Sequence, residues 1–314
     1  MIIPELLPIC MHMTPQSVPP RALMIQSLNS ILEDAEKREQ ANSHNVETPR
    51  ETTKNTGWFD VVLVGHSYGT FVAGWIIRQT VESEVLSSDS DSQSTKSALL
   101  ALPPDIRLDE KIAHVVLVDP IPILLSNPAV AHNFLYREPS TVSPVLLGSS
   151  PTPGPESPSS WYSSAAAWQL WYFASRDADI ARTLHRAFFW AEGGIWREDM
   201  AVFMRGRSQE TAPGSAATKG RNIAVVLGGL DQIVPAEAVR RYLTHEEKWE
   251  ARWVGKVPVD EHDRNHGVTP TAEPGGGGNL EVLFNPKLDH AVIFDAESFT
   301  EPLVDLVRRY VRDE

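Results

Sequence analysis

A serine between two glycines, in the motif Gly-His-Ser-Tyr-Gly at 65–69, is the strongest candidate for chemistry in this sequence of 314 residues. An apolar run precedes the motif and a helical pattern follows it. A sharp strand-to-helix turn would hold the hydroxyl of Ser67 above a sheet, where it can attack a carbonyl carbon. The backbone N–H of Tyr68 would begin the helix and could bind an oxyanion there. Gly65 and Gly69 are both expected to be required by close backbone packing in the turn. The alternative is a glycine-rich turn without chemistry.

A serine hydroxyl is a weak nucleophile and needs a base. His290 is the candidate, because it follows the last short apolar run and precedes the terminal helical pattern. A histidine in such a loop can reach back to the serine. The other nine histidines precede the motif, belong to it, or lie in a buried strand, a helical segment or charged sequence. The alternative for His290 is an ordinary surface position.

An acidic side chain is needed to orient the histidine and to stabilise its protonated form. Asp231 follows the apolar strand predicted at 222–228, at the end where parallel sheets carry functional groups. The alternative for Asp231 is a turn or helix-capping role. Asp119 ends another predicted strand and precedes Pro120, so it remains a rival for the same function.

The elements that must position these residues alternate between strands and helices. Continuous apolar runs rich in β-branched residues predict buried strands at 60–65, 113–119, 222–228 and 280–284. Helical patterns cover 20–36, 70–85 and 298–312. This order predicts an α/β fold with a mostly parallel sheet flanked by helices. Residues 1–119 and 222–314 would form the two parts of the core, and 120–221 a helical insertion.

The predicted insertion is rich in aromatic residues between 161 and 196. Trp168 and Trp171 are candidates for binding an apolar substrate, because with Tyr172 they would share one face of an α-helix. The alternative is that these rings hold the insertion together. Acidic residues of this region have no metal-ligand spacing with a histidine, so neither a metal nor a cofactor is predicted.

The segments around Ser67, Asp231 and His290 resemble the nucleophile, acid and histidine segments of the α/β-hydrolase fold. The resemblance covers the chain from 59 to the C-terminus, with a helical cap inserted after Asp119. Sequence around 131–137 and 189–190 also resembles fungal α/β-hydrolase-like proteins. The resemblance implies a serine hydrolase that cleaves a small or medium apolar ester, or a thioester or amide. It excludes the branches that use aspartate as the nucleophile.

One part of the family pattern is missing from the sequence. The family takes a second oxyanion donor from a glycine-containing loop upstream of the nucleophile, but the first glycine here is Gly57. Three explanations are open: the chain is shortened at its N-terminus, its first strand is rearranged, or the oxyanion hole is built differently. Before the nucleophile strand there is room for one strand, at 1–8, and one helix. A catalytically silent protein that binds a small molecule or a protein partner is the alternative function. A truncated product without function of its own is a third possibility.

Composition excludes several other classes of protein. The net charge of −13 opposes binding to nucleic acid. No apolar run reaches the roughly 20 residues that a transmembrane helix needs. The single cysteine, Cys10, allows no intramolecular disulfide, which favours a reducing, cytoplasmic location. The expected partner is a small ester, and the oligomeric state is not predicted.

Overall fold

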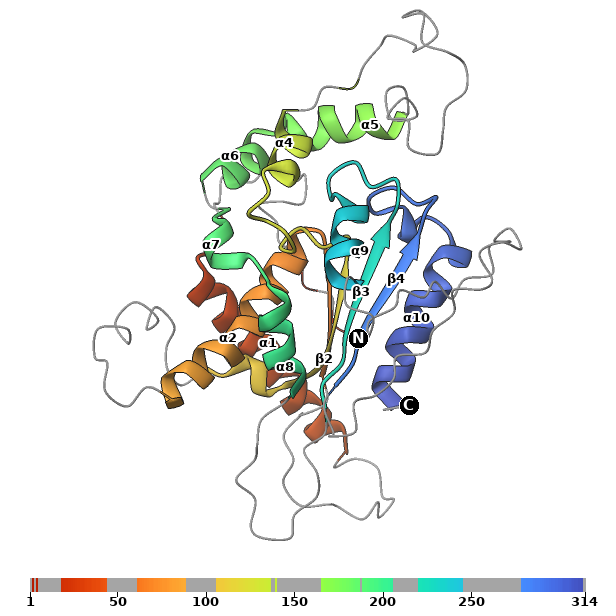
Figure 1. Cartoon of the computed structure of the whole chain (residues 1–314). Coiled ribbons are helices and arrows are strands. Elements are labelled where there is room, and N and C mark those ends of the chain that lie inside the picture. The colour runs from red at the N-terminus through yellow and green to blue at the C-terminus, as the bar shows by residue number, and fades with distance from the viewer. Residues whose placement is uncertain are drawn as a thin grey trace, which may run out of the picture.

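The computed structural model (Figure 1) describes residues 2, 4, 18–43, 61–88, 106–136, 139, 165–186, 188–205, 220–244 and 278–312. The strand expected at 1–8 falls almost entirely outside these residues. So do two stretches that the sequence predicts to be low-complexity, one rich in serine and proline at 138–160 and one ending in four glycines at 257–278.

Four parallel strands form the sheet, in the order β1-β2-β3-β4, which confirms the predicted α/β architecture. The strands are β1 (Val61–His66), β2 (Ile112–Val118), β3 (Ile223–Gly228) and β4 (Leu280–Asn285). Every residue of β3 is buried, as its continuous apolar sequence predicts. In the described sheet β1 has one neighbour, and its Val64 is 43% exposed.

Helices cover both faces of the sheet, and alternate strand residues point to each. Val115, Leu117 and Val225 join the core shared with α2 (Tyr68–Ser88), α8 (Arg197–Arg205) and α9 (Ala236–Thr244). Val116 and Val226 join the opposite core, which includes residues of α10 (Glu297–Arg312). Helix α1 (Arg21–Ser43) packs against α2, and its Met24 and Ile25 are buried in the first core.

The described part of the segment between β2 and β3 is mostly helical, apart from the turns at 119–128 and an isolated β-bridge between Ile123 and Ile195. It contains α4 (Ala129–Leu135), α5 (Ala165–Gln169), the π-helix η5 (Leu170–Ser175), α6 (Ala178–Arg186), α7 (Trp190–Gly193) and α8. In Figure 1, α4, α5 and α6 lie beyond the carboxyl ends of the strands, and α7 and α8 lie beside α2. Two short 3-10 helices, η2 (Leu108–Glu110) and η7 (Val292–Phe294), complete the described elements. No helix among these is long and apolar enough to cross a membrane.

Candidate active site

Ser67 lies on a tight turn between β1 and α2. Its φ of 49° is in the left-handed region, which is rare for a residue with a side chain. The Ser67 N–H donates to the Val118 carbonyl at 3.0 Å, so the neighbouring strand holds the turn. A Cβ on Gly65 would lie 2.8 Å from the Gly69 carbonyl oxygen, so glycine is required there, as predicted. The expectation for Gly69 was wrong, because a Cβ at that position would meet nothing within 4 Å.

The structure brings together the three residues selected from the sequence. His290 Nε2 lies 3.0 Å from Ser67 Oγ, and His290 Nδ1 lies 2.9 Å from Asp231 Oδ2. The side chain of His290 is 9% exposed and that of Asp231 is 1% exposed. Ser67, by contrast, is partly exposed. The site is therefore a continuous chain of two hydrogen bonds that runs from a buried carboxylate to the hydroxyl of a partly exposed serine.

Asp231 also shapes its own turn. Its second carboxylate oxygen, Oδ1, accepts the backbone N–H groups of Ile233 at 2.7 Å and Val234 at 2.8 Å. The turn role and the contact with His290, which were alternatives in the sequence, are therefore both present. Fixing one oxygen in the turn leaves the other aimed at the ring of His290.

The loops that carry Asp231 and His290 are hydrogen-bonded to each other along their length. The N–H of Gly229 donates to the carbonyl of Asn285 at 2.7 Å, and the N–H of Leu230 donates to that of Leu288 at 2.9 Å. Glycine is needed for this approach, since a Cβ on Gly228 would lie 2.6 Å from the Leu288 carbonyl oxygen. The backbone of one loop thus sets the distance between the acid and the base.

Asp289 and Gln232, which the sequence analysis did not select, also join these loops. The Asp289 carboxylate accepts the backbone N–H of Gln232 at 3.0 Å and its side-chain amide at 2.6 Å. It also accepts the N–H of His290 at 2.7 Å. Burial raises the pKa of Asp289, and these hydrogen bonds only partly oppose that effect. Their positions directly beside Asp231 and His290 are the only signal that the sequence contains.

Asp119, the rival acid, makes a different contact. Its Oδ2 accepts the backbone N–H of Ala291 at 2.8 Å and lies 3.5 Å from His66 Nε2. The ring nitrogen of His290 that faces a carboxylate bonds to Asp231. The acid in contact with the histidine is therefore Asp231, and Asp119 lies beside the same loop.

The electrostatic setting favours the protonated form of His290. Burial alone would lower its pKa, but the charge of Asp231 and the hydrogen bond to it act in the opposite direction. The charges of Asp119 and Asp289 add to this effect, and the resulting pKa of His290 is about 9, raised from 6.5. An imidazolium formed by proton transfer from Ser67 would therefore be strongly stabilised.

One group of side chains could in principle hold a metal ion. His66, Asp119 and His290 each place a possible ligand atom within 4.8 Å of the others, the only such group among the described residues. Both ring nitrogens of His290 are already hydrogen-bonded, and Asp119 Oδ2 accepts a backbone N–H. We therefore interpret the group as part of the hydrogen-bonded site.

Tyr68 is the first residue of α2, so its N–H precedes the hydrogen-bond ladder of that helix. Its side chain is 7% exposed and packs against Phe71 and Phe188, with ring centroids 5.4 Å and 6.0 Å away. Burial and the nearby charge of Glu192 raise the pKa of Tyr68 to about 12. The stretch 1–56, where a second oxyanion donor was sought, is described only at 2, 4 and 18–43.

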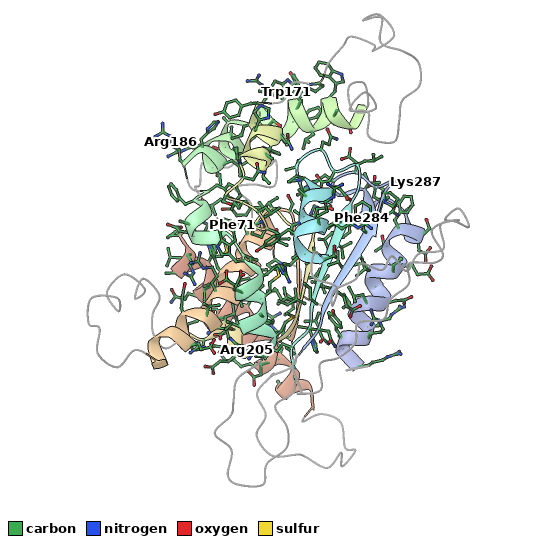
Figure 2. The ribbon with its side chains drawn as sticks, viewed as in Figure 1. Phe71, Trp171, Arg186, Arg205, Phe284 and Lys287 are labelled. Carbon is green, nitrogen blue, oxygen red and sulfur yellow. The ribbon has the colours of Figure 1, made fainter. Side chains whose placement is uncertain are left out.

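Of the two tryptophans selected from the sequence, Trp168 lies on α5 and Trp171 on η5. Trp168 is 40% exposed, and the ring of Trp171 lies 3.9 Å beneath the guanidinium of Arg176. Residues 170–175 are π-helical, so the α-helical spacing argument does not apply to them. Figure 2 shows Trp171 among the upper helices and Phe71 in the middle of the molecule. The aromatic residue between β2 and β3 that contacts Tyr68 is Phe188, which the sequence did not distinguish.

Comparison of the chain with family models, with curated proteins and with solved structures gives no significant match.

Proposed function

We propose that the protein is a serine hydrolase of the α/β-hydrolase type that cleaves a small or medium apolar ester. The observation that carries the proposal is the pair of hydrogen bonds that links Ser67 Oγ to His290 Nε2 at 3.0 Å and His290 Nδ1 to Asp231 Oδ2 at 2.9 Å. The left-handed turn at Ser67 and the parallel sheet support the resemblance to that fold. On this proposal the helices α4, α5 and α6, which lie beyond the carboxyl ends of the strands, would form a cap.

The contacts define a role for each residue in the proposed reaction. With Nδ1–H donated to Asp231, the Nε2 of His290 can accept the proton of Ser67 as its Oγ attacks the ester carbonyl. The negative charge that develops on the carbonyl oxygen would be stabilised by the N–H of Tyr68. Collapse of the tetrahedral intermediate breaks the ester bond, and His290 returns the proton to the departing alcohol. Water then attacks the acyl-enzyme by the same steps, and this releases the acid and restores Ser67.

A catalytically silent binding protein is the competing proposal. It is supported by the position of β1, which has a single neighbour in the described sheet. The sequence also has no glycine before Gly57 from which the glycine-containing loop of a second oxyanion donor could be built. Loss of one donor typically lowers kcat by about 10²–10³-fold. On our proposal, activated esters are therefore hydrolysed weakly and unactivated long-chain esters poorly.

Hydrolysis of p-nitrophenyl acetate and butyrate tests the proposal. The wild-type chain should release p-nitrophenol, and Ser67→Ala should reduce the rate to the uncatalysed level. Ser27→Ala is the matched control, because Ser27 is exposed on α1 and its hydroxyl donates to the Leu23 carbonyl of the same helix. Equal rates for wild type and Ser67→Ala would contradict the proposal and favour the binding protein.

A further inference from the structure

We propose that Asp119 is a positioning residue for His290, which holds the backbone after the histidine and supplies a second carboxylate to its protonated ring. This inference rests on the proposed function, because it assigns Asp119 to the same proton transfer. It differs from the rival role considered in the sequence, in which Asp119 would replace Asp231 on the ring.

The first support is the conformation of the residue after the histidine. Ala291 has a φ of 64°, in the left-handed region, where a residue with a Cβ is strained. Such a conformation persists when its surroundings hold it. The 2.8 Å hydrogen bond from the Ala291 N–H to Asp119 Oδ2 is such a constraint, since it joins the histidine loop to the end of β2.

The second support is that Asp119 is itself firmly placed. It directly follows β2, has a φ of 47°, and its N–H donates to the Val226 carbonyl of β3 at 2.9 Å. The preceding carbonyl, of Val118, accepts the N–H of Ser67 at 3.0 Å. The same turn therefore contacts the nucleophile through its backbone and the histidine loop through its side chain.

The third support is the charge balance. Asp119 is 3% exposed, and its only ion-pair partner among the described residues is an imidazole, that of His66. A buried carboxylate without a counter-charge is costly, and the imidazoles of His66 and His290 are the two groups of this cluster that can carry one. A carboxylate oxygen of Asp119 and a ring nitrogen of His290 lie within 4.8 Å of each other. The imidazolium that forms on His290 can therefore serve as that counter-charge.

The groups that face His290 come from every element around it. Ser67 and His66 approach from the end of β1, and Asp119 from the end of β2. Asp231 approaches from the loop after β3, and Asp289 from the same loop as the histidine. Three carboxylates thus lie near His290: Asp231 bonds to its ring, Asp119 lies within 4.8 Å of a ring nitrogen, and Asp289 accepts its backbone N–H. Asp231 and Asp119 follow different strands. Removing Asp119 should leave Asp231 in contact with the ring but weaken both the charge and the backbone constraint.

Two substitutions separate the charge from the backbone constraint. Asp119→Asn keeps an oxygen that can accept the Ala291 N–H, but it removes the negative charge. The midpoint of the His290 titration, followed by NMR, should then fall by about one unit, as for loss of a charge within about 4–6 Å. Asp119→Ala removes the constraint as well. At high pH, Asp119→Ala should have a kcat about tenfold lower than that of Asp119→Asn. Adding Ala291→Gly should recover part of this loss, since glycine adopts left-handed φ without strain.

Asp109→Asn is the matched control, because Asp109 is fully buried at the other end of β2 and bonds to Thr80 and Arg107. It should lower stability without moving the His290 titration. An unchanged midpoint in folded Asp119→Asn, or a shift of the same size in Asp109→Asn, would overturn the inference. The NMR titration requires no turnover, so failure of the proposed function would appear separately, as absence of Ser67-dependent hydrolysis. If Asp119→Asn does not fold, the double variant Asp119→Asn, Ala291→Gly is titrated and compared with Ala291→Gly alone. A lower His290 midpoint in the double variant supports the inference, and an unchanged midpoint overturns it.

Discussion

The loops at the carboxyl ends of β3 and β4 differ sharply from the helices α5 and η5. Backbone and side-chain hydrogen bonds hold the two loops together. At Gly228 and Gly229, carbonyl oxygens of the histidine loop lie so close that a Cβ would clash with them. On α5 and η5, by contrast, Trp168, Tyr172 and Phe173 are 40%, 70% and 58% exposed. The geometry of Asp231 and His290 is thus fixed by the backbone. Among the described residues, the exposed rings of Trp168, Tyr172 and Phe173 have few hydrogen bonds or close backbone contacts of this kind around them.

This difference separates two kinds of functional residue. Groups that transfer protons must stay within hydrogen-bond distance, and small displacements cost large factors in rate. Side chains that only contact a substrate tolerate movement. We therefore expect substitutions in the paired loops to change the rate of hydrolysis, and substitutions on α5 and η5 to change substrate preference.

The largest effect is expected from Asp231→Asn. The amide nitrogen would face Nδ1 of His290 and favour the wrong tautomer, so kcat should fall by about 10⁴-fold. Asn keeps an oxygen that can accept the N–H groups of Ile233 and Val234, so the turn should remain folded. Kinetics on p-nitrophenyl butyrate, with circular dichroism to verify folding, measure this. A loss below tenfold would show that the contact seen in the structure is not used in catalysis.

A smaller but still large effect is expected from pH. The base must be neutral, and the pKa of His290 is about 9, so kcat/KM should fall about tenfold for each unit of pH below 9. The raised pKa stabilises the fold fully below pH 6.5, and this stabilisation is lost as the pH rises through 9. As the pH rises from 6.5 to 9, kcat/KM should therefore increase while Tm decreases. The rate of Ser67→Ala at each pH is subtracted as the uncatalysed background. In a separate control, His290→Gln should remove the contribution of the histidine to the pH dependence of Tm. A kinetic midpoint near 6.5 would contradict the electrostatic account.

A moderate effect is expected from Gly228→Ala. The new Cβ would lie 2.6 Å from the Leu288 carbonyl oxygen and would push the two loops apart. Overpacking of this kind costs about 1–3 kcal/mol of stability, and activity should fall with it. Gly69→Ala provides the comparison, since a Cβ there meets nothing within 4 Å and alanine favours the helix. Thermal unfolding of both variants measures the difference, and equal losses would show that loop packing is not what requires glycine.

The smallest effect is expected from Trp168→Ala. Because the ring is 40% exposed, its loss should change KM or chain-length preference by a few-fold and leave Tm nearly unchanged. Phe188→Ala should instead lower Tm, since this ring lies 4.6 Å from that of the fully buried Phe71. A lowered Tm with unchanged kinetics in Trp168→Ala would assign the tryptophan to packing alone.

The strands and the three residues of the site could be predicted from sequence because each has a local signal. Apolar β-branched runs fixed the positions of the strands, and the turn, acid and histidine each follow one of them. Parallel strands place their carboxyl ends at one edge, so three segments far apart in sequence converge without further information. Asp119 satisfied the same rule, which is why the choice between it and Asp231 required the structure.

The features that sequence missed depend on contacts between loops. Nothing local indicates that Gln232 bonds to Asp289, or that Ala291 adopts a left-handed conformation. The role of Gly69 was misjudged because motif spacing does not reveal which glycine the backbone approaches. The spacing argument for Trp168 and Trp171 did not hold for a related reason, since it assumes an α-helix and residues 170–175 form a π-helix.

Covalent labelling of Ser67 tests the central claim most directly. A fluorophosphonate probe reacts with a serine whose hydroxyl is activated by a base, and mass spectrometry locates the modified residue. The account predicts a single label on Ser67 in the folded wild type and in Ser27→Ala. It also predicts no label in Ser67→Ala and much slower labelling in His290→Gln. Folded wild-type protein that takes up no label, or that is labelled equally in Ser67→Ala, would contradict it.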